Sequence, residues 1–244
     1  MFLNVREPPF DHLRVRQALN FATDRARIVE LVGGPEVAAT TCQILPPAFP
    51  GHQHYCPYTA RPTAGGGWTA PDMDRARKLV KASGTAGERV VVRVPSFRRS
   101  VGRYFTGLLD DLGYHASLRS QPYLSYFPSI QDPRSRVQIG FVGWAADSIA
   151  PSSFIDDNFT CPRRGGLNAS RLCDRRLTRL VDRALAAPAI EAPPAWAAAD
   201  RRVTDLAAAV ALTNERAVVF VSKRVGNVQH HPQWFTLLDQ MWVR

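Results

Sequence analysis

The stretch Val137-Gln138-Ile139-Gly140-Phe141-Val142-Gly143 indicates the fold class, because it is a short, mostly apolar run that leads directly into Trp144. A run of this length and composition predicts a strand buried inside a sheet. Residues 89–94 are rich in valine and end at Pro95, which predicts a second strand. Two apolar strands in one chain favour a fold built around a covered sheet.

Helical patterns separate these strands from one another. We expect helices over residues 15–33, 72–82, 101–112, 174–187 and 194–212, and further strands over residues 2–5, 115–119 and 217–221. Asp11 is the candidate N-cap of the first helix, which Gly33-Gly34 would end. Strands that alternate with helices predict an α/β fold with both faces of the sheet covered.

The composition fits a globular protein with an excess of arginine. The 244 residues are 45% hydrophobic and 21% charged, with a formal net charge of +10, and no apolar stretch approaches the roughly 20 residues of a membrane span. The basic excess would suit nucleic acid, but no helix-turn-helix, aromatic platform or zinc-finger spacing accompanies it. The arginines near residues 14–27 and 175–183 share helices with carboxylates, so we expect solvated helix faces and no nucleic-acid partner.

Four cysteines fall into two local pairs, Cys42 with Cys56 and Cys161 with Cys173, each in a loop. An even count in paired loops predicts two disulfides and an oxidising compartment. Each would contribute about 3 kcal/mol in the chain-entropy model. Two alternatives stay open for the first pair: a Cys2His2 zinc site completed by His52 and His54, or free buried thiols.

No pattern of catalytic residues stands out. The chain has no G-x-S-x-G elbow, no G-x-G-x-x-G after a strand and no P-loop. The acidic pairs at residues 110–111 and 156–157 are adjacent in sequence, and neighbours do not face each other on a helix. We therefore expect no enzymatic activity and no cofactor. Residues 1–9 lack the features of a signal peptide, so an export signal would lie outside this sequence.

Six motifs occur in an order that is typical of one family. They are residues 8–25, 45–51, 74–79, the run Gly143-Trp144-Ala145-Ala146-Asp147, residues 168–174 and residues 221–227. In this order they resemble the family 5 extracytoplasmic solute-binding proteins, which serve ABC importers of dipeptides, oligopeptides and nickel complexes. The resemblance covers nearly the whole chain.

The resemblance implies half of a two-lobed protein. Family members are about twice this length and close on a ligand between two lobes, and the matched motifs belong to the C-terminal half. It implies a periplasmic-binding-protein type II lobe with both hinge crossings and without the N-terminal lobe. Residues 1–216 would form the C-terminal lobe, beginning with a hinge strand at residues 2–5. Residues 217–244 would form the return hinge strand and a tail that packs on the other lobe.

The implied function is transport. An extracytoplasmic protein, monomeric when full length, would capture a peptide or similar small polar solute and deliver it to an ABC permease in the membrane. The alternative is the ligand-sensing domain of a larger regulatory protein. An upstream signal peptide with a lipidation cysteine would favour transport, and an upstream regulatory module would favour sensing.

The resemblance also implies ligand-binding residues. Asp147 occupies the position that pairs with the α-ammonium of a peptide, and its structural alternative is a cap for the next turn. Trp144 would wall the pocket or fill the core. Phe141 stands where some oligopeptide binders carry an arginine, which leaves the ligand carboxylate without an obvious partner. The further candidates are Phe154, Tyr123 and Asn168. Residues 148–151 also depart from the Tyr-Pro-Asp-Pro of many members.

Overall fold

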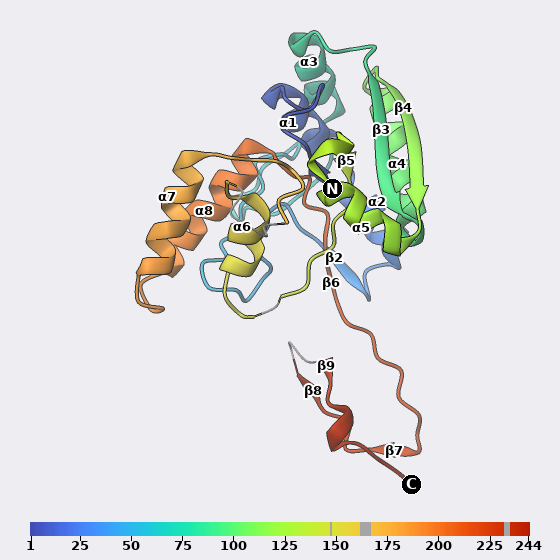
Figure 1. The fold of residues 1–244 in the computed structure, drawn as a ribbon, viewed down its shortest axis with the longest axis vertical. Coiled ribbons are helices and arrows are strands. Elements are labelled where there is room, and N and C mark those ends of the chain that lie inside the picture. The colour runs from blue at the N-terminus through green and yellow to red at the C-terminus, as the bar shows by residue number, and fades with distance from the viewer. Residues whose placement is uncertain (147, 162–166, 232–234) are drawn as a thin grey trace.

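A four-stranded sheet in the order β1-β5-β3-β4 forms the centre of the fold (Figure 1). The computed structural model describes residues 1–146, 148–161, 167–231 and 235–244. β3 (Arg89–Pro95) and β4 (His115–Gln121) pair in parallel over seven residues. β5 (Ile139–Gly140) lies parallel to β3, and β1 (Phe2–Leu3) closes the sheet antiparallel to β5. The α/β class and these four predicted strands are confirmed, although the strands expected over residues 2–5 and 137–143 are shorter in the structure.

Helix α4 (Arg99–Asp111) connects β3 to β4 after the short 3-10 turn η1 (Ser96–Arg98), and it packs closely on the sheet. Gly102 lies at the contact. A Cβ atom there would come within 2.6 Å of Leu118 Cδ1 and 2.8 Å of Val94 Cγ2. The close approach of this helix to the sheet therefore depends on glycine.

Two helices replace the single one expected over residues 15–33. They are α1 (Leu13–Ala22) and α2 (Arg25–Val32), and they pack with α3 (Met73–Ser83) beside the sheet. The chain breaks at Thr23, whose hydroxyl donates a 2.7 Å hydrogen bond to the Leu19 carbonyl. Asp24 then caps α2 by accepting from the Arg27 amide at 3.0 Å. His12 rather than Asp11 is the N-cap residue of α1.

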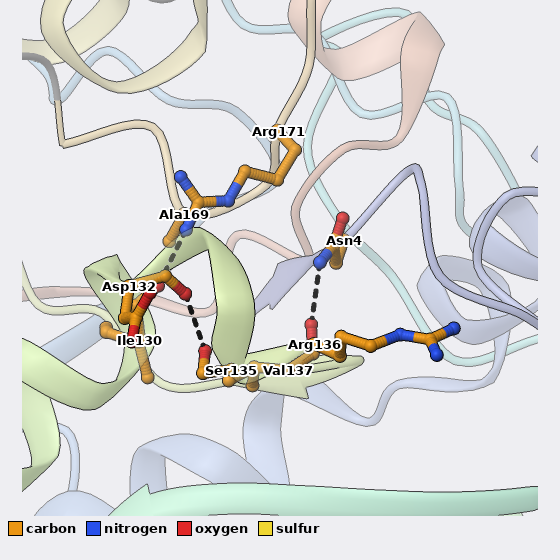
Figure 2. Close-up of a pocket in the computed structure, with 8 residues that line it drawn as sticks. All are labelled: Asn4, Ile130, Asp132, Ser135, Arg136, Val137, Ala169 and Arg171. Carbon is orange, nitrogen blue, oxygen red and sulfur yellow. Dashed lines mark hydrogen bonds between the residues drawn. The ribbon is translucent and has the colours of Figure 1, made fainter.

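Helix α5 (Tyr123–Gln131), which the sequence did not predict, joins β4 to β5 through the 3-10 turn η2 (Pro133–Ser135). Tyr126 fixes it to the sheet: its hydroxyl accepts from the Phe141 amide at 2.7 Å and lies 2.8 Å from the Phe141 carbonyl. A small polar cavity of about 10 Å³ lies below this helix, beside Asn4 and Arg171 (Figure 2). That volume suits at most one water molecule and is too small for a ligand.

Three further helices form a second layer beside the sheet (Figure 1). They are α6 (Ser152–Phe159), also unpredicted, α7 (Arg175–Ala186) and α8 (Pro193–Leu206). Their apolar sides form a separate core cluster with Leu45 from an early loop. Asp174 caps α7 by accepting from the Leu177 amide at 2.7 Å, and its carboxylate pairs with Arg202 on α8 at 2.7 Å.

The chain after α8 is extended, not helical as expected to residue 212. The Leu3 amide donates to the Ala208 carbonyl at 2.9 Å, and the Val210 amide donates to the Met1 carbonyl at 2.7 Å. These bonds place residues 208–210 along the free edge of β1. Pairing across the chain therefore overrides the helix propensity of this alanine-rich run.

Beyond this edge the chain forms β6 (Thr213–Glu215), which pairs antiparallel with β2 (Ala38–Thr40). The strand expected over residues 217–221 is wrong, because this segment has no strand pairing in the structure. The remaining elements are short: β7 (Val225–Gly226), β8 (His230–His231), β9 (Phe235–Thr236), η3 (Leu238–Gln240) and β10 (Trp242–Val243).

The tail, which is described over residues 217–231 and 235–244, leaves the body of the fold after β6 (Figure 1). Its described part exposes several large apolar side chains, and Phe220 is 96% exposed. An apolar surface of this kind typically marks a contact with another protein surface. Within the described residues, no helix combines the length and apolar character needed to cross a membrane.

Candidate ligand-binding site

A cavity of about 700 Å³ lies outside the carboxyl ends of two parallel strands. Phe141 to Trp144 follow β5, and Arg98 follows β3 by three residues, so both segments reach the same edge of the sheet. Ligands of open α/β sheets bind at this kind of edge. The loop over residues 41–49, helix α6 and residues 209–217 also line the cavity, and further lining residues are Met1, Phe2, Leu167, Ala169, Ser170 and Phe235.

Aromatic side chains form one wall of the cavity. Phe141 and Phe154, at 7% and 9% exposure, line it together with Trp144, so the structure brings three of the predicted residues together. Phe49 adds a fourth ring, in an edge-to-face contact with Phe154 at 5.1 Å between centroids. The Trp144 Nε1 atom is buried and has no hydrogen-bond partner among the described residues.

The other predicted residues lie elsewhere. Asp147 falls outside the described residues. Tyr123 is 57% exposed, packs on the ring of Phe127 at 5.0 Å, and does not line the cavity. Asn168 is buried and donates 2.7 Å hydrogen bonds to the carbonyls of Thr160 and Leu172. It therefore stabilises the loop between α6 and α7.

Arg98 is the cavity residue that the sequence analysis missed. Its guanidinium lies 5.1 Å from the ring centroid of Phe141 and donates from Nη2 to both carboxylate oxygens of Glu215, at 2.6 and 2.7 Å. Its Nε atom is buried without a partner in the described part of the chain. Its position in the sequence was the available signal, because Arg98 lies three residues after a strand that ends at Pro95 and so falls near the carboxyl edge of the sheet.

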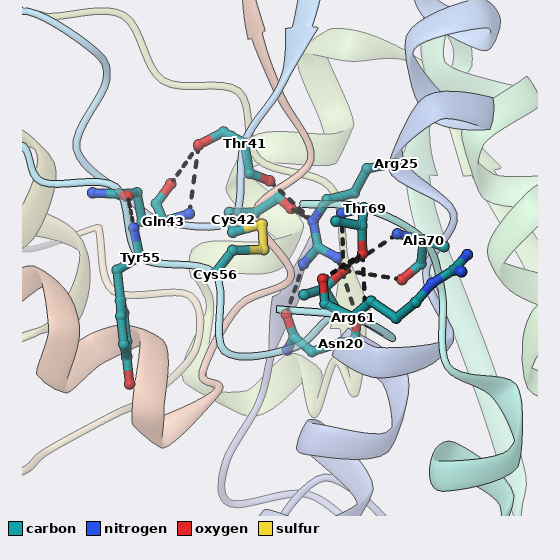
Figure 3. Close-up of a disulfide and its surroundings, with 12 residues drawn as sticks. Asn20, Arg25, Thr41, Cys42, Gln43, Tyr55, Cys56, Arg61, Thr69 and Ala70 are labelled. Atoms are coloured by element: carbon teal, nitrogen blue, oxygen red, sulfur yellow. Dashed lines mark hydrogen bonds between the residues drawn. A yellow bond between two sulfur atoms is a disulfide. The ribbon is translucent and has the colours of Figure 1, made fainter. Parts of the chain in front are cut away.

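A disulfide-closed loop over residues 42–56 contributes Gln43, Ile44, Pro46 and Phe49 to the lining of the cavity, and Figure 3 shows this disulfide and its surroundings. Cys42 and Cys56 form the disulfide, as predicted, and so do Cys161 and Cys173 in the second loop. The zinc alternative is wrong, because both cysteines it needs are bonded to each other. Among the described residues, no group of three His, Cys, Asp or Glu side chains could hold a metal ion.

Asp200 on α8 accepts hydrogen bonds from this loop and fixes its position. Its carboxylate is 2% exposed and accepts from the Gln43 side chain at 2.7 Å and from the Ile44 amide at 2.9 Å, both cavity-lining residues. Burial raises the pKa of Asp200 to about 6, although these hydrogen bonds act in the opposite direction. Gln43 in turn accepts from the Tyr55 amide at 2.9 Å, which ties the two ends of the loop together.

Arg25 supports the same loop from the other side (Figure 3). Its side chain is fully buried, and Nε donates to the carbonyls of Thr41 at 3.0 Å and Ala211 at 2.9 Å. Its other nitrogens bind Asn20, and burial lowers its pKa to about 10. Arg16 is also buried and donates to the Phe10 carbonyl at 2.7 Å. The expectation of a solvated arginine face is therefore wrong for these two residues.

Comparison with known proteins places the chain in a family. Residues 1–166 match the family described as bacterial extracellular solute-binding proteins, family 5 Middle. The chain is 28% identical over 185 residues to the probable di/tripeptide-binding protein 5 of Pseudomonas aeruginosa (strain UCBPP-PA14). This alignment covers 73% of this chain and 33% of that protein.

Solved structures share the fold. The clavulanic acid biosynthesis oligopeptide binding protein 2 is 24% identical with a TM-score of 0.85, over 99% of this chain and 45% of that one. The periplasmic binding protein DppA from Helicobacter pylori, in complex with peptide STSA, is 19% identical with a TM-score of 0.82. The match covers 99% of this chain and 46% of that one.

The chain thus spans about a third of that curated relative and about half of these solved structures. The expectation of a solute-binding α/β protein, and not an enzyme, is confirmed at the level of the family. This chain belongs to the bacterial extracellular solute-binding proteins of family 5.

Proposed function

We propose that this chain is the C-terminal lobe of a two-lobed extracytoplasmic protein that captures a peptide and delivers it to an ABC permease. Residues 1–216 would form the lobe. Residues 217–244, whose apolar side chains are exposed here, would pack on a second lobe. The relatives named for di/tripeptide and oligopeptide binding support a peptide ligand. The full protein would then be a monomer that closes around its ligand.

Two unpaired donors at one cavity carry this proposal. Trp144 Nε1 and Arg98 Nε are both buried, both belong to cavity-lining residues, and neither has a partner among the described residues. Buried polar groups normally have hydrogen-bond partners, so a pair without them calls for a ligand that accepts hydrogen bonds. The carbonyl and carboxylate oxygens of a peptide meet this requirement, and the aromatic wall would contact an apolar side chain of the peptide.

The two ends of the peptide would bind different charges. Arg98 would bind the terminal carboxylate, which gives that group the partner that Phe141 cannot offer. Asp147 remains our candidate for the α-ammonium. It follows Trp144 by three residues in the sequence.

The test is peptide binding by the full-length protein. Ligand retained through purification would be identified by mass spectrometry, and dipeptide affinity would be measured by calorimetry. Trp144→Phe keeps the ring and removes the donor, so we expect it to weaken binding about fivefold, the value of one typical hydrogen bond. Asp147→Ala should weaken binding further.

Trp68→Phe is the matched control, because Trp68 also has a buried Nε1 without a partner in the described residues but does not line the cavity. It should bind like the wild type. A full-length protein that binds no peptide, or that loses equal affinity with Trp68→Phe and Trp144→Phe, would contradict the proposal.

A further inference from the structure

Arg98 already binds a carboxylate, and that carboxylate belongs to the protein. Glu215 stands at the end of β6, where its backbone pairs with Ala38 of β2, and it reaches across the cavity edge to Arg98 Nη2. Both side chains line the cavity. We propose that Glu215 competes with the ligand for Arg98. A ligand must therefore displace the Glu215 carboxylate with its own terminal carboxylate. This inference rests on the proposed peptide function.

The Arg98–Glu215 pair leaves the arginine incompletely bound. Both oxygens of Glu215 accept from the single nitrogen Nη2, while Nε stays without a partner in the described chain. A guanidinium binds a carboxylate best in a fork, with two nitrogens donating to two oxygens. A ligand carboxylate that engages Nε as well as Nη2 therefore satisfies a buried donor that Glu215 leaves unpaired, in the better fork geometry.

Of the two side chains in this ion pair, Glu215 can move away easily and Arg98 cannot. The side chain of Glu215 is 44% exposed, and that of Arg98 is 18% exposed. Glu215 can turn into solvent, where a released carboxylate is well hydrated and loses little. Arg98 is held at the end of β3 and against the ring of Phe141, so it stays in place for the ligand.

The rest of the lining offers no second carboxylate for this exchange. Of the described residues around the cavity, Glu215 carries the one acidic side chain. The other cation, Arg216, donates to the carbonyls of Pro35 and Glu36 at 3.4 and 3.5 Å. Glu215 consequently selects for a free terminal carboxylate: a ligand that ends in a neutral group leaves the Arg98–Glu215 pair intact.

The experiment compares two probes on the full-length protein. Calorimetry would measure the affinity of the dipeptide Ala-Phe and of its C-terminal amide for the wild type and for Glu215→Gln. Glutamine keeps the shape and removes the competing charge. We expect Glu215→Gln to raise the affinity for the free acid about fivefold, because binding then no longer has to break the partly exposed Arg98–Glu215 ion pair. The affinity for the amide should stay unchanged, because the amide does not displace Glu215.

Glu36→Gln is the control for net charge, because Glu36 is exposed near β2 and does not line the cavity. It should change neither affinity. Thermal unfolding of each variant would check that the fold is intact, and Glu215→Ser would repeat the test should Glu215→Gln unfold.

The outcomes separate this inference from the proposed function. A wild type that binds the free acid, together with a Glu215→Gln variant that binds it no more tightly or gains equally for the amide, overturns the inference alone. A wild type that binds neither peptide overturns the proposed function, and the inference with it.

Discussion

Replacing Asp200 with asparagine is expected to make the stability of the protein less dependent on pH. Asp200 is 2% exposed, and its hydrogen-bond partners among the described residues are the Gln43 side-chain amide and the backbone amides of Ile44 and Leu45. Its pKa rises from 3.8 to about 6 because burial disfavours the charged form. Asparagine presents the same oxygen to the Ile44 amide and carries no charge at any pH.

The sign follows from the direction of the shift. A carboxyl whose pKa is raised by folding stabilises the folded state fully below its unfolded pKa, and this contribution is lost as the pH rises through the folded pKa. The rise of the Asp200 pKa from 3.8 to about 6 corresponds to about 3 kcal/mol. The wild type should thus lose about 3 kcal/mol relative to Asp200→Asn between about pH 4 and about pH 7. Loss of the Gln43 contact adds a cost of about 1 kcal/mol that does not depend on pH.

The assay is urea unfolding of the full-length wild type and variant across this pH range, with the difference in unfolding free energy plotted against pH. Asp74→Asn, at an exposed position in α3, controls for the loss of one charge. A difference that stays flat with pH would refute the reasoning, because it would mean that the buried carboxylate does not titrate with a raised pKa.

Three further substitutions test the scaffold by urea unfolding of the full-length protein. Gly102→Ala should cost about 1 to 3 kcal/mol by overpacking against β3 and β4, whereas Gly107→Ala on the same helix, with no atom within 4 Å of the new Cβ, should stabilise by about 0.5 kcal/mol; equal effects would contradict the close contact. Arg25→Met should cost about 3 kcal/mol through unpaired buried carbonyls, and exposed Arg27→Met less than about 0.5 kcal/mol. Cys42→Ser should cost about 3 kcal/mol, and adding reductant should then cause no further loss from this loop.

Local sequence signals account for the elements that were predicted correctly. β3 and β4 carry β-branched or alternating residues, and α3 and α7 begin at the capping residues Asp72 and Asp174. The disulfides also follow from local spacing. In each case the residues that decide the structure lie within about one loop or one helix of each other.

Long-range contacts decided the elements that the sequence analysis missed. The run over residues 207–212 looks helical by composition, but it becomes extended because β1 offers backbone partners about 200 residues away. Arg25 is buried because carbonyls from Thr41 and Ala211 converge on it. The role of Arg98 depends on the parallel pairing of β3 with β5, which sets the cavity at its position. No local periodicity in the sequence predicts these long-range contacts.

The pairing of residues 208–210 with β1 has a consequence for the order of synthesis. β1 is the edge strand of the sheet, and an uncovered edge presents free amide and carbonyl groups to any other strand. Once β1 has been synthesised, about 200 further residues must be added before the segment that covers its outer edge is made. The outer edge of β1 is therefore uncovered while the intervening residues are made, and a chain that stops before residue 208 would leave that edge open to self-association.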